Sequence, residues 1–465
     1  LPDYFIDKAN QNGIFNGRIV VVKSTSKGAT DAFYQQDGLY TTCIRGLENG
    51  KKTDETIINS SISRVLSAKE DWSTILKCAH DPNMQIILSN TTEVGIVLME
   101  DDIHLSPPRS FPGKLLGFLV ERFKTFSGSN ESGMIIIPTE LITDNGTKLR
   151  SIVIELAKMN TLDEAFIHWL QTANHFCNSL VDRIVPGQLE AHDKIITEKK
   201  LGFTDDLMIM AESFRLWAIE TGDQKVVDTL SFSKADDGIV ISPDIEKFRE
   251  LKLRLLNGTH SFCCGLAMLA GFDTVKDTMN DGPMEAFARR LMELEIATAM
   301  TSSNIPYDEA CTFADKVMNR FRNPYLNHKW SSIAVNYTSK MRMRNISLLE
   351  GYYHIKGTVP EHMALGFAAY LLFMKCREIK GGYYNEINGQ TNLIEDEAAS
   401  WFADNWASND TDKMVDLALA NKDLWGADLS ELNGLAQAIK ENISLLQKEG
   451  VMSAINSRQP RKTIA

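Results

Sequence analysis

Three residues near the middle of the chain have the types and the spacing of a reaction site. Lys252, Asn257 and His260 occupy positions i, i+5 and i+8 of a segment that is otherwise rich in leucine. In an α-helix, about 100° per residue places Asn257 about 140° and His260 about 80° from Lys252. All three polar groups therefore fit within one half of the helix surface.

The chemistry of this trio would be proton transfer at a carbonyl or an alcohol. Burial of the intervening leucines would partly desolvate a lysine, and desolvation brings an amine toward proton exchange near neutrality. An amide and an imidazole beside it could hold the reacting oxygen. These are the groups of a metal-free carbonyl reductase. The alternative is an amphipathic helix with a lysine that reaches along its surface to water and a histidine in the core.

Composition and charge narrow the class of protein. A chain of 465 residues predicts two domains. The net charge of −12 argues against a nucleic-acid or anionic membrane partner. The longest apolar run, Met363–Met374, is too short to span a bilayer and predicts a buried helix. The nine histidines show no HExxH or paired ligand spacing, so no metal site is expected.

Seven cysteines without a CxxC pair are typical of reduced thiols, and nothing resembles a signal peptide. We therefore expect a cytoplasmic protein. The carbonyl or alcohol chemistry of Lys252, Asn257 and His260 predicts a small-molecule substrate.

The first half of the chain alternates short apolar runs with amphipathic stretches, which predicts a mostly parallel sheet with helices in residues 1–242. The expected strands are Arg18–Val22, Met84–Leu88, Gly133–Ile137, Val181–Val185 and Gly238–Ser242. The expected helices include Leu1–Gln11, Leu115–Phe126 and Lys148–Met159.

The second half, residues 243–465, has a helical apolar period almost throughout, which predicts an all-helical domain that begins after Ser242-Pro243. The expected helices include Ile245–Asn257, Pro283–Met300, Tyr307–Phe321 and Pro360–Arg377. The segment Ile379–Asn392 is rich in Gly, Tyr and Asn, so a surface loop is expected there.

A polar turn follows the second expected strand. Asn90, Thr91 and Glu93 would lie at the carboxyl end of a parallel strand, where dinucleotides bind. Their side chains could hold ribose or phosphate, or could simply close a turn without a ligand. The segment Val22–Ser26 contains no acidic residue that would favour NAD over NADP, and no Gly-rich phosphate loop occurs in this half.

Several motifs in order along essentially the whole chain resemble the mannitol dehydrogenase family of long-chain polyol dehydrogenases. They include Lys252-x4-Asn257-x2-His260-Ser261, Val181-Asp-Arg-Ile-Val-Pro186, Asn90-Thr-Thr-Glu-x-Gly95 and Arg320-Phe-Arg-Asn-Pro324. The resemblance implies a Rossmann-like domain, NAD as the cofactor, and Lys252 as the proton donor with Asn257 and His260 on the substrate oxygen. It also implies a Gly-rich loop before Leu1.

Within the family, the likeness is greatest to members that act on uronates. It rests on the stretches Gln36–Leu47, Ile136–Gly146 and Ser332–Arg344, and it implies interconversion of D-tagaturonate and D-altronate. Sister activities on fructuronate or mannitol remain alternatives. A nucleotide-binding protein without catalysis is an alternative of another class.

Two departures from the polyol-oxidising members concern the substrate. Leu141 replaces one amide of their oxygen-binding site, and Ser332 replaces an arginine, which leaves room for a terminal carboxylate. Lys340, Arg342 and Arg344 form the nearest basic cluster, with Lys340 and Arg344 on one helical face. A solvated basic surface is the alternative interpretation.

Overall fold

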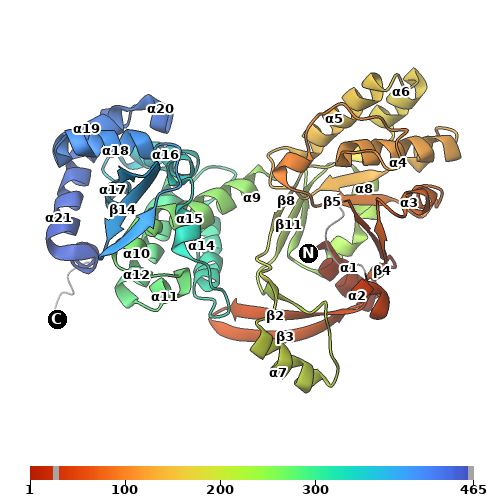
Figure 1. Cartoon of the computed structure of the whole chain (residues 1–465), viewed down its shortest axis with the longest axis horizontal. Helices are drawn as coiled ribbons and strands as arrows, with labels where there is room; N and C mark the ends of the chain where they lie inside the picture. The colour runs from red at the N-terminus through yellow and green to blue at the C-terminus, as the bar shows by residue number, and fades with distance from the viewer. Residues whose placement is uncertain (25–30, 459–465) are drawn as a thin grey trace. The chain divides into compact units, whose positions relative to one another are not determined.

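The computed structural model describes residues 1–24 and 31–458 (Figure 1). Two compact units are present: unit 1 comprises Leu1–Arg45 and Thr53–Glu246, and unit 2 comprises Gly46–Lys52 and Lys247–Ala465. Thr25 and Ser26, in the segment that leaves the choice between NAD and NADP open, lie outside the described residues.

Most of the strand pairs in unit 1 are parallel, as expected. Strand β1 (Ile19–Lys23) pairs with β4 (Ile62–Ser67), and β6 (Ile135–Pro138) pairs with β5 (Ile86–Ser89) and β7 (His175–Phe176). Strand β11 (Leu216–Glu220) runs parallel to β12 (Ile239–Ser242) and antiparallel to β8 (Ser179–Asp182).

The expected strand Val181–Val185 is wrong in its second half, because β8 ends at Asp182. The reason is a side chain from a distant strand. The carboxylate of Glu212 accepts the N–H of Ile184 at 2.6 Å, so this backbone group bonds to a side chain and not to a neighbouring strand.

The core of unit 1 has one apolar cluster on each side of its central strands. Ile136 belongs to the cluster formed with helices α4 (Phe111–Thr125), α5 (Asn145–Met159) and α6 (Glu164–Thr172), seen beside one another in Figure 1. Its neighbours Ile135 and Ile137 belong to the opposite cluster with α1 (Pro2–Gln11), as strand alternation requires. Shorter helices are α2 (Asp31–Gln35), α3 (Trp72–Cys78) and α8 (Gln224–Thr229).

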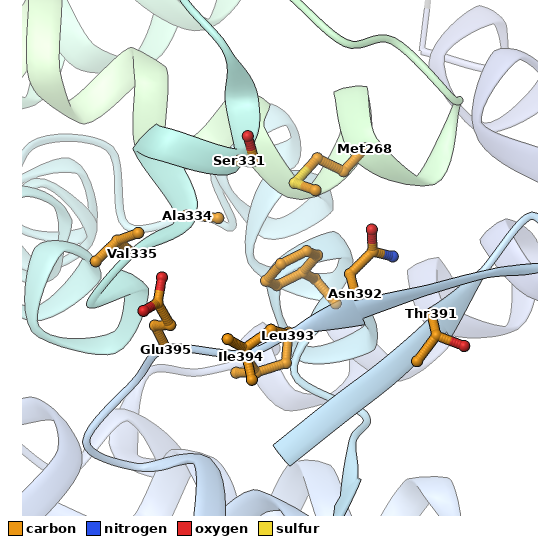
Figure 2. Close-up of a pocket in the computed structure, with 10 residues that line it drawn as sticks. Met268, Ser331, Ala334, Val335, Thr391, Asn392, Leu393, Ile394 and Glu395 are labelled. Atoms are coloured by element: carbon orange, nitrogen blue, oxygen red, sulfur yellow. The ribbon is translucent and has the colours of Figure 1, made fainter. Parts of the chain in front are cut away.

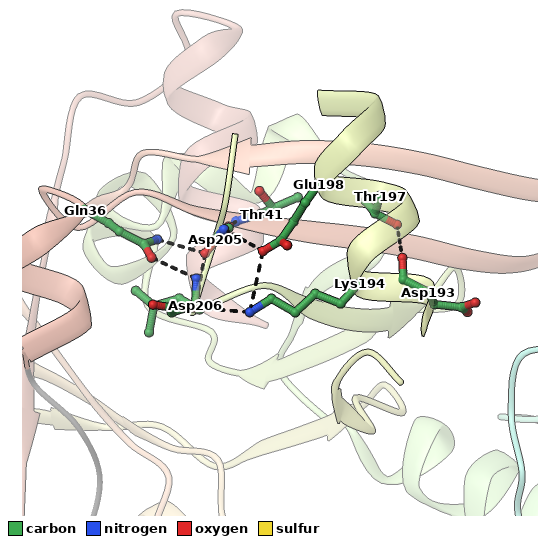
Figure 3. Close-up of polar contacts among 9 residues, drawn as sticks. Gln36, Thr41, Asp193, Lys194, Thr197, Glu198, Asp205 and Asp206 are labelled. Atoms are coloured by element: carbon green, nitrogen blue, oxygen red, sulfur yellow. Dashed lines mark hydrogen bonds and ion pairs between the residues drawn. The ribbon is translucent and has the colours of Figure 1, made fainter. Parts of the chain in front are cut away.

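Another sheet, most of which lies in unit 1, was not expected from the sequence. Its strand order is β3-β2-β10-β9, with bounds Lys51–Asn59, Tyr40–Glu48, Ile209–Glu212 and Gly187–Gln188, and helix α7 (Ala191–Leu201) lies nearby in the chain. The buried Asp205 carboxylate ties it together, accepting from the Thr41 N–H at 2.5 Å and the Gln36 amide at 2.8 Å (Figure 3). Glu198 of α7 in turn accepts the Asp205 N–H.

Unit 2 is mainly helical, as the 3.6-residue period predicts. The expected helix Pro360–Arg377 is wrong at its end, because the helix stops at Phe373 and Arg377 begins a strand. The larger helices of unit 2 are α10 (Thr259–Leu269), α12 (Gly282–Arg290), α14 (Tyr307–Phe321), α16 (Tyr337–Lys356), α17 (Glu361–Phe373) and α21 (Leu435–Asn456). Shorter ones are α9 (Glu246–Leu251), α11 (Val275–Met279), α13 (Ala297–Ala299), α15 (Trp330–Ala334), α18 (Ala399–Ser408), α19 (Thr411–Ala420) and α20 (Lys422–Trp425).

The expected surface loop Ile379–Asn392 is wrong. This segment forms most of an antiparallel sheet of β13 (Arg377–Ile379), β14 (Gly382–Ile387) and β15 (Gln390–Leu393). The glycines read as loop residues lie in its tight turns, with Gly381 and Gly389 at positive φ. Buried Asn385 anchors the sheet by donating to the Phe373 carbonyl at 2.7 Å.

Helices α10 and α17 approach each other closely because each carries a glycine at the crossing. A Cβ on Gly265 would lie 2.8 Å from the Ala369 carbonyl, and one on Gly366 would lie 2.8 Å from the Phe262 oxygen. Gly366 therefore does not interrupt the apolar helix but lets it pack. Among the described residues, no helix has the length and apolar composition of a membrane span.

We predict that Gly265→Ala lowers the free energy of unfolding by about 1–3 kcal/mol, since its methyl group would meet backbone atoms that cannot rotate away. Gly282→Ala is the matched control, because a Cβ there has no heavy atom within 4 Å. Urea unfolding of both variants checks this; equal stabilities would contradict the close-packing role of Gly265.

Candidate functional site

The segment that carries Lys252 and Asn257 is a π-helical turn. Lys252–Gly258 continues α9 with i→i+5 hydrogen bonding before α10 begins at Thr259. In such a turn residues i and i+5 lie one above the other, so Lys252 and Asn257 share a face that a regular α-helix would not give them. Both side chains are half-buried, and each directly follows a buried leucine, Leu251 and Leu256 respectively.

The π turn is fitted to helix α16. A Cβ on Gly258 would lie 2.9 Å from the Asn345 Oδ1 atom, so glycine lets the wider turn pack against this helix. On the same side, the Asn257 carbonyl accepts hydrogen bonds from the Ser261 hydroxyl at 3.1 Å and the Arg344 guanidinium at 3.4 Å. Tertiary contacts therefore hold a backbone form that is rare on its own.

His260 lies one turn further on, buried but with a ring nitrogen unused. Its side chain is stacked on the Phe321 ring at a centroid distance of 4.3 Å and meets the His328 ring edge-on at 5.3 Å. The residue is 7% exposed, and its Nε2 atom has no hydrogen-bond partner among the described residues. A buried imidazole with a free nitrogen is equipped to bond an oxygen that enters the site.

Positive charges surround this imidazole. Burial, and after it the charges of the surrounding basic residues, holds the pKa of His260 well below its ordinary value, so the ring is neutral. These residues are His328, Arg344, Arg320 and Lys340, and we call them the basic cluster around His260. Burial and the charge of Arg344 likewise lower the pKa of Lys340.

The structure brings two of the three expected carboxylate-binding residues into this cluster. Lys340 donates to the Ile333 carbonyl at 2.9 Å, and Arg344 bonds the Ser261 hydroxyl at 3.2 Å. Arg342 is not part of it, since its side chain is exposed and donates to the Asp423 carbonyl at 3.3 Å. Residue i+2 on a helix points away from residues i and i+4, and this places Arg342 on another face.

The motif Arg320–Pro324 gains a physical explanation here. Arg320 supplies one charge of the basic cluster, Phe321 supplies the surface on which His260 stacks, and Arg322 pairs with Glu285. His328, which follows shortly after, was missed by sequence reasoning because a single histidine in a loop gives no periodic signal.

Unit 1 contains a large cavity at the carboxyl ends of strands β1 and β5. Its volume is about 840 Å³, and its lining includes Val22 and Lys23 of β1 and Ser89 of β5. Asn90 and Thr91 also line it, whereas Glu93 begins the 3-10 turn η1 (Glu93–Gly95). Cavities at this place in parallel sheets bind nucleotides.

A buried carboxylate holds the turn at Asn90 and Thr91. Glu140, 3% exposed, accepts the Thr91 N–H at 2.7 Å, the Thr91 hydroxyl at 2.9 Å and the Ser89 hydroxyl at 3.0 Å. The Thr91 hydroxyl is therefore already bonded within the protein. Leu141, the neighbour of Glu140, is 64% exposed and offers no polar group.

Part of the same cavity is an apolar slot between two strand edges. Val20 and Val22 of β1 line it together with Ile86 and Leu88 of β5. Among the described residues, β1 pairs only with β4 and β5 only with β6, so the edges that remain have no strand partner. Unpaired strand edges with apolar side chains between them are able to pair with a further strand.

Unit 2 has a smaller cavity of about 360 Å³ beside helix α15, shown in Figure 2. Met268, Phe373 and Ile394 supply apolar lining, and Glu395 is its one ionisable residue. None of the expected site residues lines this cavity, so it is separate from the expected site at Lys252, Asn257 and His260. In the described part of the chain, no group of three or more His, Cys, Asp or Glu residues could hold a metal ion.

Two family models match successive parts of the chain. The mannitol dehydrogenase Rossmann domain matches residues 4–230, and the mannitol dehydrogenase C-terminal domain matches residues 244–447. The altronate oxidoreductase of Bacillus subtilis (strain 168) is 35% identical over 459 residues, which are 97% of this chain and 91% of that protein. The altronate oxidoreductase of Shigella flexneri is 36% identical over 464 residues, covering 97% and 93%.

Two solved structures share the fold. A D-sorbitol dehydrogenase in substrate-free form has a TM-score of 0.76 at 20% identity and covers 98% of this chain and 92% of that one. The Pseudomonas fluorescens mannitol 2-dehydrogenase, in a ternary complex with NAD and D-mannitol, has a TM-score of 0.66 at 21% identity and covers 99% and 92%.

The neutral state of His260 predicts a loss of stability in acid. In the unfolded chain a histidine takes up a proton near pH 6.5, whereas the folded protein resists it, so stability present above that pH is lost as pH falls. We expect the urea midpoint to fall more steeply between pH 7.5 and 5 in the wild type than in His260→Gln. The exposed His354→Gln is the control and should keep the wild-type slope; a wild-type slope in His260→Gln would contradict the interpretation.

Proposed function

The chain belongs to the mannitol dehydrogenase family, and from this premise we propose that it is an NAD-dependent oxidoreductase that interconverts D-tagaturonate and D-altronate. Full-length likeness to altronate oxidoreductases supports the reaction. The observation that carries the choice of substrate is the basic cluster around His260, because a uronate carries a negative charge that is attracted to these basic side chains.

Lys252 is the proton carrier of this reaction. NADH supplies the hydride that reduces the ketone carbon. In that direction the Lys252 ammonium group gives its proton to the substrate oxygen, which becomes the hydroxyl group of altronate. In the direction of oxidation, the neutral amine takes the same proton. The π turn supports this role, since Lys252 and Asn257 lie on one face of the segment.

Asn257 and His260 hold the oxygen on which charge develops. The amide of Asn257 donates a hydrogen bond, and the neutral imidazole of His260 has the unpartnered Nε2 atom for another. Because Leu141 is apolar, that position offers no second amide, and Asn257 and His260 alone stabilise the charge on the oxygen in this proposal. Preorganised donors of this kind are each worth about 10²–10³ in turnover.

The substrate carboxylate binds at Lys340 and Arg344. Both side chains are half-buried, and burial lowers the pKa of each, so an anion beside them is stabilised more strongly than at a solvated surface. Arg342 has no part in this, because it lies on another face of α16.

The cavity of unit 1 fits the cofactor in size and in position. Asn90 and the Thr91 backbone would contact the nucleotide, and Glu140 would hold their turn in place.

We predict that Lys252→Ala lowers tagaturonate reduction at least about 10³-fold, because the variant loses the proposed proton carrier, while NADH binding persists. Lys413→Ala, at an exposed position of α19, should keep wild-type activity. NADH oxidation and NADH fluorescence titration measure the two properties. Near-wild-type turnover in Lys252→Ala would reject the proton carrier.

Substrate choice has a matched pair of variants on α16. Lys340→Met should raise the KM for tagaturonate about 10- to 100-fold, the range expected when a bond to a charged group is lost, and should change fructose reduction little. Arg342→Met should leave both unchanged. Initial rates on tagaturonate, fructuronate and fructose with NADH decide the activity; a preference for fructose or fructuronate would replace the proposed substrate.

A further inference from the structure

Tyr337, the first residue of α16, bonds directly to the helix that carries His260. Its hydroxyl accepts the Gly265 N–H at 3.0 Å and donates to the Ser261 carbonyl at 2.5 Å. The side chain is fully buried. Its ring packs against Tyr370 at a centroid distance of 4.8 Å, which leaves the hydroxyl little freedom.

The two bonded groups are the ends of a single helical turn. In a regular α-helix the Gly265 N–H donates to the Ser261 carbonyl, and here the Tyr337 hydroxyl bonds to both. A side chain inserted in this way alters the local geometry of a helix. Since Ser261 directly follows His260, the hydroxyl acts on the turn that begins at the imidazole.

The start of α16 is itself fixed from a distant part of unit 2. The Asp396 carboxylate accepts the Thr338 N–H at 2.7 Å and the Thr338 hydroxyl at 2.7 Å. The Tyr370 hydroxyl completes this network with Thr338 at 2.7 Å. On the other side of Tyr337, the Asn336 N–H donates to the Glu395 carbonyl at 2.7 Å, so the backbone is held both before and after this residue.

Arg344 provides a second attachment seven residues further along α16. It bonds the Asn257 carbonyl and the Ser261 hydroxyl, and a spacing of seven places Arg344 on the same face as Tyr337. Helix α16 thus holds the segment from Asn257 to Gly265 at both ends. His260 lies between the two points of attachment.

We propose that Tyr337 is a positioning residue for the reaction, whose hydroxyl fixes the Ser261–Gly265 turn and thereby the direction in which the His260 imidazole presents Nε2 to the substrate oxygen. The inference rests on the proposed function of His260. Burial also raises the pKa of Tyr337 well above its ordinary value, so the hydroxyl keeps its proton and the attachment persists at every working pH.

The test removes one oxygen atom. Tyr337→Phe keeps the ring packing and lets the Gly265 N–H and the Ser261 carbonyl bond to each other, so the variant should fold. We expect kcat to fall about 10- to 100-fold, the effect of a small misplacement of a catalytic group, with the KM for tagaturonate and the NADH dissociation constant within about twofold of wild type. Tyr353→Phe, which removes a hydroxyl bonded to the Asn433 carbonyl elsewhere on α16, is the matched control and should leave kcat unchanged.

A measurement without substrate separates this inference from the proposed function. In protein with labelled histidine, the ring resonances of His260 should shift in Tyr337→Phe and stay in place in Tyr353→Phe. If Tyr337→Phe is too unstable to assay, Thr338→Val, which loosens the start of α16, should shift the same resonances and lower kcat. Unshifted His260 resonances together with wild-type kcat in folded Tyr337→Phe would overturn the proposal, whereas a wild type inactive on uronates would overturn the proposed function alone.

Discussion

The change from i→i+4 to i→i+5 hydrogen bonding at Lys252–Gly258 is the constraint on which the site in unit 2 depends. It places Lys252 and Asn257 on one face, and α16 packs against it. Gly258 leaves room for Asn345, and Arg344 takes up the Asn257 carbonyl. A backbone form that is rare in isolation is thus held by a neighbouring helix, as is common where helices carry function.

The electrostatics of the site run against those of the chain. A protein of net charge −12 repels an anionic substrate at long range, yet the basic cluster places buried and half-buried positive groups around one neutral imidazole. Burial lowers the pKa of Lys340 and of Arg344, which shows how poorly their charges are solvated. In the proposed function a bound carboxylate would relieve that cost, and this relief would favour a uronate over an uncharged sugar.

Unit 1 shows the same use of buried carboxylates to fix irregular backbone. Glu140 holds the turn beyond β5, Asp205 ties the second sheet, and Glu212 diverts the chain after Asp182. Each carboxylate accepts a hydrogen bond from a backbone N–H group that has no partner in a strand or helix. Each of these backbone segments is therefore held by a single side chain, and the one held by Glu140 lines the cavity of unit 1.

The sequence by itself determined the order of the architecture, the trio on one helical segment, and the family, which the comparisons confirm. These follow from local spacing: apolar period separates strands from helices, and Lys340 and Arg344 share a face at i, i+4. Only the tertiary structure decided that Lys252 and Asn257 lie on a π turn and that Arg342 lies apart from Lys340 and Arg344. It also decided that His328 and Phe321 pack against His260, and that residues 377–393 form a sheet. The reason is that hydrogen-bond partners and burial in these places come from residues distant in the chain, which no local pattern encodes.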